Sequence, residues 1–138
     1  MKISLLDRSL YYKGLILLIR QDRKIHDEEK KMMLSIGKQL GFDPKFCAKT
    51  IDEILDNPYI FDSPPLFSDT RIALCFIRDG LGVSAADGQI HEAEIAWLKS
   101  VAERNGLDDS WRGELEKLSQ ASHGLSDRSL ELRNFEWE

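Results

Sequence analysis

Acidic and histidine side chains recur at one spacing in two short segments of the chain. The pattern Asp-x3-His-x2-Glu is formed by Asp22, His26 and Glu29, and again by Asp87, His91 and Glu94. Carboxylate oxygen together with imidazole nitrogen suits Zn²⁺ or Mn²⁺, whereas carboxylates with backbone carbonyls suit Ca²⁺ or Mg²⁺. The sequence therefore predicts a divalent-metal site, and it does not distinguish among these four ions.

Helix capping is the alternative interpretation of the same residues. If His26 and His91 are N-caps, Glu29 and Glu94 occupy the third helical position, where a glutamate can accept a bond from the N-cap N–H as half of a capping box. Acids in a first turn also gain about 0.3–1 kcal/mol each from the helix dipole. Capping does not explain histidine at the cap twice, because Ser, Thr, Asp or Asn would serve better. Both interpretations stay open.

The two segments belong to an internal repeat. A shift of 65 residues aligns them without a gap, and four identical pairs are Asp22 with Asp87, Ile25 with Ile90, Gly41 with Gly106, and Asp43 with Asp108. Such an ordered set predicts the duplication of one helical unit of about 50 residues. Units that pack about a pseudo-two-fold axis would bring the two acidic turns together.

Each unit is expected to form three helices, so the predicted fold class is an all-α helical bundle. The first helices are expected over about 7–21 and 68–86, and the first of these is apolar on most sides, which is typical of a central helix. The second helices are expected over about 27–40 and 92–105. Both end at glycine, where a left-handed cap favours it.

The third helices are expected to begin at caps formed by Asp43, which precedes a proline, and by Asp108. Their inward-facing residues are expected to be Phe46, Thr50, Ile51 and Ile54 in one, and Trp111, Leu115 and Leu118 in the other.

A proline-rich strap and a C-terminal tail complete the predicted single domain over 1–138. Three prolines in 56–67 preclude a regular helix, while the aromatic residues among them favour packing over the bundle. The tail, 122–138, is either a last short helix docked on the bundle or a partner-binding segment. The expected organisation is unit one at about 8–55, the strap at 56–67, unit two at about 68–121, and then the tail.

Composition limits the function classes. The 138 residues suit one domain, and 24 acidic against 19 basic residues argue against nucleic-acid binding. The longest apolar run, Leu15 to Ile19, is far short of the roughly 20 residues that span a bilayer. Cys47 and Cys75 suit reduced thiols in a cytoplasmic protein. No nucleophile or phosphate-loop motif is present, so we expect no enzymatic activity.

Residues 85–94, Ala-Ala-Asp-Gly-Gln-Ile-His-Glu-Ala-Glu, resemble the turn of the TerB-like (tellurite-resistance) family, with Leu98 and Gly106 following at the family's spacing. Asp22, Ile25, Glu29 and Met33 repeat the pattern, so the resemblance covers about 8–121. Arg23 replaces the turn glycine in the first unit, which makes the second unit the better candidate site.

The resemblance implies an all-helical, non-enzymatic stress-response module whose acidic turns bind divalent metal. The ligands carried over are Asp22, Glu29, Asp87 and Glu94, whereas His26 and His91 are not part of the family pattern. A related domain precedes the J-domain in membrane-anchored co-chaperones, which implies a protein partner and peripheral association with a membrane protein.

Two functions therefore follow as hypotheses. The first is a metal-binding TerB-like module. The second is a protein-interaction scaffold or co-chaperone-type module without metal, in which the acidic turns serve only as helix caps. The sequence determines neither the partner nor the oligomeric state.

Overall fold

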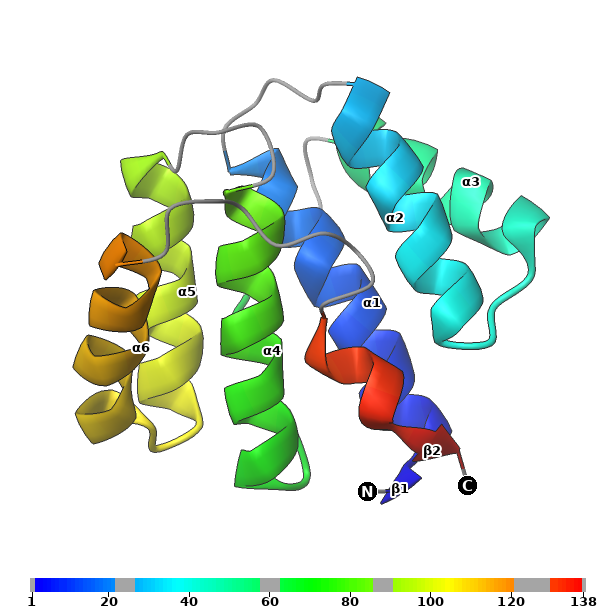
Figure 1. The fold of residues 1–138 in the computed structure, drawn as a ribbon. Coiled ribbons are helices and arrows are strands. Elements are labelled where there is room, and N and C mark those ends of the chain that lie inside the picture. The colour runs from blue at the N-terminus through cyan, green and yellow to red at the C-terminus, as the bar shows by residue number, and fades with distance from the viewer. Residues whose placement is uncertain (1, 22–26, 58–62, 86–90, 121–129, 138) are drawn as a thin grey trace.

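The computed structural model describes residues 2–21, 27–57, 63–85, 91–120 and 130–137. These form six α-helices, one 3₁₀ helix and two two-residue strands (Figure 1). The α-helices are α1 (Leu5–Arg20), α2 (Asp27–Gln39), α3 (Pro44–Asp56), α4 (Thr70–Ser84), α5 (Glu92–Arg104) and α6 (Asp108–Gln120); η2 is Glu131–Asn134, and the strands are β1 (Lys2–Ile3) and β2 (Glu136–Trp137). The prediction of an all-α bundle is confirmed.

Glycine ends α2 and α5 in the same way. Gly41 and Gly106 have φ of 84° and 71°, the left-handed region that favours glycine. In each case the next residue, Phe42 or Leu107, donates its N–H to the carbonyl five residues back, at 2.9 Å and 2.8 Å. These are Schellman caps, and both predicted ends are confirmed.

The third helices begin differently from one another. Asp43 is the N-cap of α3, and its Oδ1 accepts the Lys45 N–H at 2.7 Å, as predicted. The prediction that Asp108 caps α6 is wrong by one residue. The Leu107 carbonyl already accepts the N–H groups of Ser110 and Trp111, so Asp108 lies inside the first turn.

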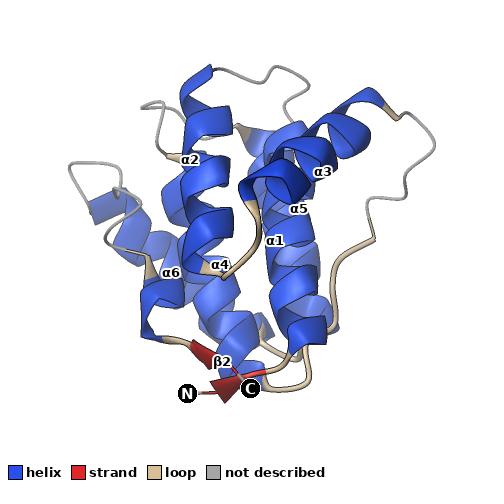
Figure 2. Ribbon diagram, turned by 90° about the vertical axis from the view of Figure 1, so that its right-hand side faces the viewer, coloured by secondary structure: helices blue, strands red, loops and turns tan. Residues whose placement is uncertain are grey.

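Helix α1 is the centre of the bundle (Figures 1 and 2). It packs against α2, α3, α4 and α5. From Tyr11 to Ile19 all but one of its residues are buried, the exception being Lys13. A helix that is apolar on nearly all sides can bury its surface only in this position, so the prediction of a central first helix is confirmed.

Polar side chains of α1 connect it to α2. The guanidinium of Arg8 donates to the carbonyl of Leu40 at 3.0 Å, and the hydroxyl of Tyr12 donates to the carbonyl of Met33 at 2.9 Å. The first bond satisfies a carbonyl at the C-terminal end of α2, where the last turn lacks intrahelical donors. These contacts fix α2 along α1.

Asp7 connects the start of α1 to the entry of α4. Its carboxylate accepts hydrogen bonds from the hydroxyl of Ser4 and from both the N–H and the hydroxyl of Ser68. Asp7 is 2% exposed, and a buried carboxylate requires such donors. The beginnings of the two helices are thereby held together.

Residues 63–67, the described end of the strap, are attached to α5 by one side chain. Asn105 Oδ1 accepts the N–H of Phe67 at 3.0 Å, and its Nδ2 donates to the carbonyl of Pro65 at 2.9 Å. Pro65 and Phe67 are buried. Residues 58–62 lie outside the described part, so a strap over the whole of 56–67 stays a prediction.

The described part of the tail, 130–137, docks on the bundle. Leu130 and Leu132 are buried, and Phe135 meets Tyr11 edge-on with ring centroids 5.3 Å apart. β2 pairs in parallel with β1, so both termini lie at one end (Figure 2). This short pairing was not expected from the sequence, because two-residue strands give no alternating pattern.

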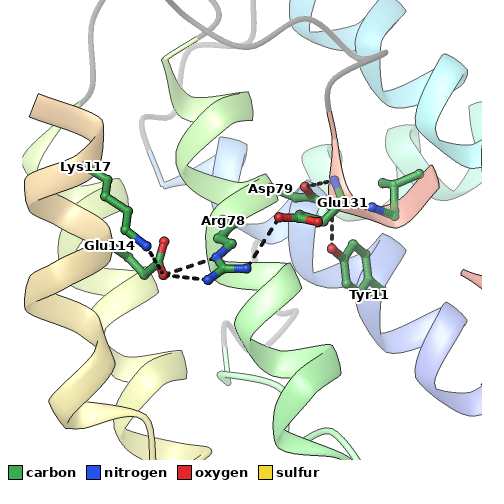
Figure 3. A network of polar contacts seen from close by, with 7 residues as sticks. Tyr11, Arg78, Asp79, Glu114, Lys117 and Glu131 are labelled. Atoms are coloured by element: carbon green, nitrogen blue, oxygen red, sulfur yellow. Dashed lines mark hydrogen bonds and ion pairs between the residues drawn. The ribbon is translucent and has the colours of Figure 1, made fainter. Parts of the chain in front are cut away.

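A buried carboxylate on α4 anchors the tail (Figure 3). Asp79 accepts the hydroxyl of Tyr11, the N–H of Glu131 at 2.6 Å and the N–H of Leu132 at 3.0 Å. Burial raises the pKa of Asp79 to about 6, although these three donors favour the charged form. Beside it, Arg78 pairs with Glu114 at 3.0 Å and with Glu131 at 3.5 Å.

Three further expectations concern Phe46, the two cysteines and the length of the helices. Phe46 was expected to face inward but is 43% exposed, because it packs at the edge of the bundle against Phe42. Both cysteines are free thiols, and burial raises the pKa of Cys75 to about 11. None of the described helices has the length and apolar character that a bilayer crossing requires.

Two glycine substitutions should have opposite effects on stability. A Cβ on Gly37 would overlap Cys47 Sγ and approach the Tyr12 ring to 3.0 Å, whereas one on Gly113 would meet no described atom within 4 Å. Gly37→Ala should lower the free energy of unfolding by about 1–3 kcal/mol. Gly113→Ala should raise it by about 0.5–1 kcal/mol. Urea unfolding measures both, and a gain in Gly37→Ala would contradict the close packing of α2, α3 and α1.

Removing the hydroxyl groups of the adjacent tyrosines of α1 should cost different amounts of stability at pH 8, where Asp79 is charged. Tyr11→Phe removes a hydrogen bond to a buried carboxylate and should cost about 1.5–3 kcal/mol. Tyr12→Phe removes a bond to a neutral carbonyl and should cost about 1 kcal/mol. Equal losses in urea unfolding would mean that Asp79 is not charged there.

Candidate acidic site at the first turns of α2 and α5

Glu29 and Glu94 occupy the third position of α2 and α5, and both are buried. Glu29 is 5% exposed and Glu94 is 2% exposed, while their neighbours Glu28 and Glu92 are exposed. Charged side chains are almost never fully buried unless they have partners. The two matching glutamates are therefore unusual for residues in a first turn.

His91 is the N-cap of α5, as predicted. Its backbone is extended (φ −86°, ψ 145°), and its carbonyl accepts the N–H groups of Glu94 and Ile95. Its own N–H donates to Oε1 of Glu94 at 3.4 Å. The glutamate half of the predicted capping box is thus confirmed at the start of α5.

The environment of Glu94 disfavours its charge. Its pKa is raised to about 7, chiefly by burial and in smaller part by the negative charge of Glu29. The N–H of His91 and its imidazole lower the pKa without cancelling the effect of burial. The Ser84 hydroxyl acts in the same direction, although its buried oxygen lies outside strict hydrogen-bonding geometry with every described group. The carboxyl of Glu94 therefore gains or loses its proton near neutral pH.

The structure brings some of the predicted ligands together. Glu29 and Glu94, from different helices, are close enough for their charges to interact, and His91 borders the same region. Asp22, His26 and Asp87 lie outside the described residues. Within the described part of the chain, no group of three or more His, Cys, Asp or Glu side chains could hold a metal ion. Two buried carboxylates beside a histidine can bind a proton or contribute to a cation site.

Sequence reasoning missed Ser84 and Asp79, both buried polar residues of α4. Asp79 stands between the buried Ile77 and Gly80. A single acid within an apolar stripe was the signal that could have revealed it, because such a residue needs buried donors.

Comparison of the chain with protein-family models, with curated proteins and with solved structures gives no match.

Glu94 should make the protein less stable as the pH rises. Its folded pKa of about 7 exceeds the ordinary value of 4.5, so between these pH values the folded chain holds a proton that the unfolded chain has released. Stability then falls as pH rises through this window. The free energy of unfolding of Glu94→Gln, taken relative to that of the unmodified chain, should rise by on the order of 1–3 kcal/mol from pH 5 to pH 8. Urea unfolding in EDTA at several pH values measures the difference.

Glu92→Gln is the matched control, since Glu92 lies in the same turn but is exposed. The difference in free energy of unfolding between Glu92→Gln and the unmodified chain should change little over the same pH range. If Glu94→Gln behaves like Glu92→Gln, the charge on Glu94 is not disfavoured by burial.

Proposed function

We propose that the chain is a non-enzymatic, TerB-like stress-response module that binds a divalent metal ion through two acidic turns. In this proposal α1–α3 and α4–α6 are duplicated units. The identical caps at Gly41 and Gly106 and the identical positions of Glu29 and Glu94 support the duplication. A cytoplasmic location and a protein partner belong to the same proposal.

The burial and coupling of Glu29 and Glu94 carry the proposal. A glutamate that only caps a helix gains from the dipole at the surface and has no reason to be buried. Here both are buried, and the charge of one raises the pKa of the other. Two like charges at a buried site cost free energy, which a bound divalent cation would offset.

The donor set would combine described and undescribed residues. Glu29 and Glu94 would supply carboxylates from the two helices, and Asp22 and Asp87 are the further ligands that the family resemblance implies. His26 and His91 would add imidazole nitrogen, which favours Zn²⁺ or Mn²⁺ over Ca²⁺ or Mg²⁺. A bound ion would supply positive charge between the two turns and so stabilise their packing.

A thermal melt with each ion tests this function. The chain is melted in EDTA and then with Ca²⁺, Mg²⁺, Mn²⁺ or Zn²⁺. An ion at about 100 times its dissociation constant should stabilise by about 2.7 kcal/mol. For a domain of this size that is a rise in Tm of about 10 °C. We expect a selective rise for one ion.

Variants assign the rise to the acidic turns. Asp87→Asn and Glu94→Gln should reduce the rise while the helical circular dichroism is retained. Asp109→Asn, an exposed acid in the first turn of α6, should leave it unchanged. A flat response to all four ions, or equal loss in all three variants, would contradict the metal site.

A protein-interaction scaffold without metal is the alternative. The exposure of the neighbouring leucines Leu5 and Leu6, at 62% and 70%, favours it because adjacent exposed apolar side chains mark interaction surfaces. Under this alternative the acidic turns are helix caps, and the melts in EDTA and in metal coincide.

A further inference from the structure

A cavity of about 450 Å³ lies between α1, α3 and residues 63–65. Its size falls within the roughly 300–1,000 Å³ typical of small-molecule sites. Its lining residues are Leu10, Lys13, Gly14, Leu17, Phe46, Thr50, Glu53, Ile54, Ser63 and Pro65. None of these belongs to the acidic turns, so the cavity is a separate feature.

Apolar side chains form most of the lining. Leu10, Gly14 and Leu17 lie four and three residues apart, so they share one face of α1. Phe46 and Ile54 come from one face of α3. Gly14 itself packs closely below the cavity, because a Cβ there would lie 2.9 Å from the Phe76 ring.

An exposed aromatic residue borders the opening. Phe46 belongs to the lining and is 43% exposed. Such exposure next to a cavity leaves apolar surface in water that an apolar ligand would cover. The cavity and its border therefore select for a ligand with an extended apolar part.

The two charged residues of the lining, Lys13 and Glu53, differ in whether they form an ion pair. Glu53 pairs with Lys49 at 3.8 Å along α3. Lys13 is exposed and forms no ion pair with a described residue. Among the described lining residues, Lys13 is therefore the cation without an ion-pair partner, and its charge favours an anionic group on the ligand.

We propose that this cavity binds an amphipathic anion, namely an alkyl chain of medium length with a terminal carboxylate. The chain lies among Leu10, Leu17, Phe46 and Ile54. The carboxylate lies at the Lys13 ammonium. Each methylene that enters the cavity raises the affinity about fourfold, so affinity grows with chain length until the cavity is filled.

Titration calorimetry of the full chain in EDTA tests the proposal, with octanoate and decanoate below their micelle concentrations and decanol below its solubility limit as probes. EDTA makes the result independent of the metal site. We expect saturable 1:1 binding, with decanoate tighter than octanoate. Amide shifts of Gly14 and Thr50 in ¹⁵N NMR spectra locate the bound probe.

Two matched pairs of variants assign the contacts. Lys13→Gln should weaken decanoate about fivefold or more and leave decanol unchanged, whereas Lys31→Gln, at an exposed lysine of α2, should change neither. Phe46→Ala should weaken both probes. Leu34→Ala, at a side chain equally exposed (40%) but outside the cavity, should weaken neither.

Three outcomes would overturn the proposal. The first is an absence of saturable binding by either acid. The second is an equal effect of Lys13→Gln and Lys31→Gln, which would mean non-specific attraction by surface charge. The third is binding that shifts amides of other regions while Gly14 and Thr50 stay unchanged.

Discussion

The burial of α1 is the constraint on which the rest of the structure depends. Because this helix is surrounded on nearly all sides, its buried polar side chains need hydrogen-bond partners in other elements. Arg8 and Tyr12 find theirs in α2, Asp7 at the entry of α4, and Tyr11 in Asp79. One central helix therefore fixes both halves of the bundle and, through Asp79, the tail.

Three buried acids in the described part of the chain, Asp7, Asp79 and Glu94, differ in how many hydrogen bonds they accept. Asp7 and Asp79 each accept hydrogen bonds from three donors, and those donors belong to the segments that the acids hold in place. Glu94 accepts one long backbone bond at 3.4 Å and is repelled by Glu29. An acid with three donors holds the donor segments in place even where burial raises its pKa, as for Asp79, whereas a buried acid with a raised pKa and few donors is typical of functional sites. This difference separates the structural acids from the candidate site.

Much of the fold was predictable because its signals are local. Helix ends at Gly41 and Gly106 follow from backbone conformation, and the cap at Asp43 follows from its own side chain. The central place of α1 follows from its apolar composition. The start of α6 shows the limit of such signals. Asp108 has a typical N-cap side chain, but the first helical hydrogen bonds are accepted by the carbonyl of Leu107, one residue earlier.

For the site, the sequence by itself determined which acids recur and that Glu94 can accept the N–H of His91, because a capping interaction spans only three residues. Only the tertiary structure decided that Glu29 and Glu94 are buried together, that Asp79 receives the tail, and that Phe46 borders a cavity instead of entering the core. Burial and charge coupling depend on segments more than 50 residues apart. No pattern within one helix records how closely its neighbours will pack.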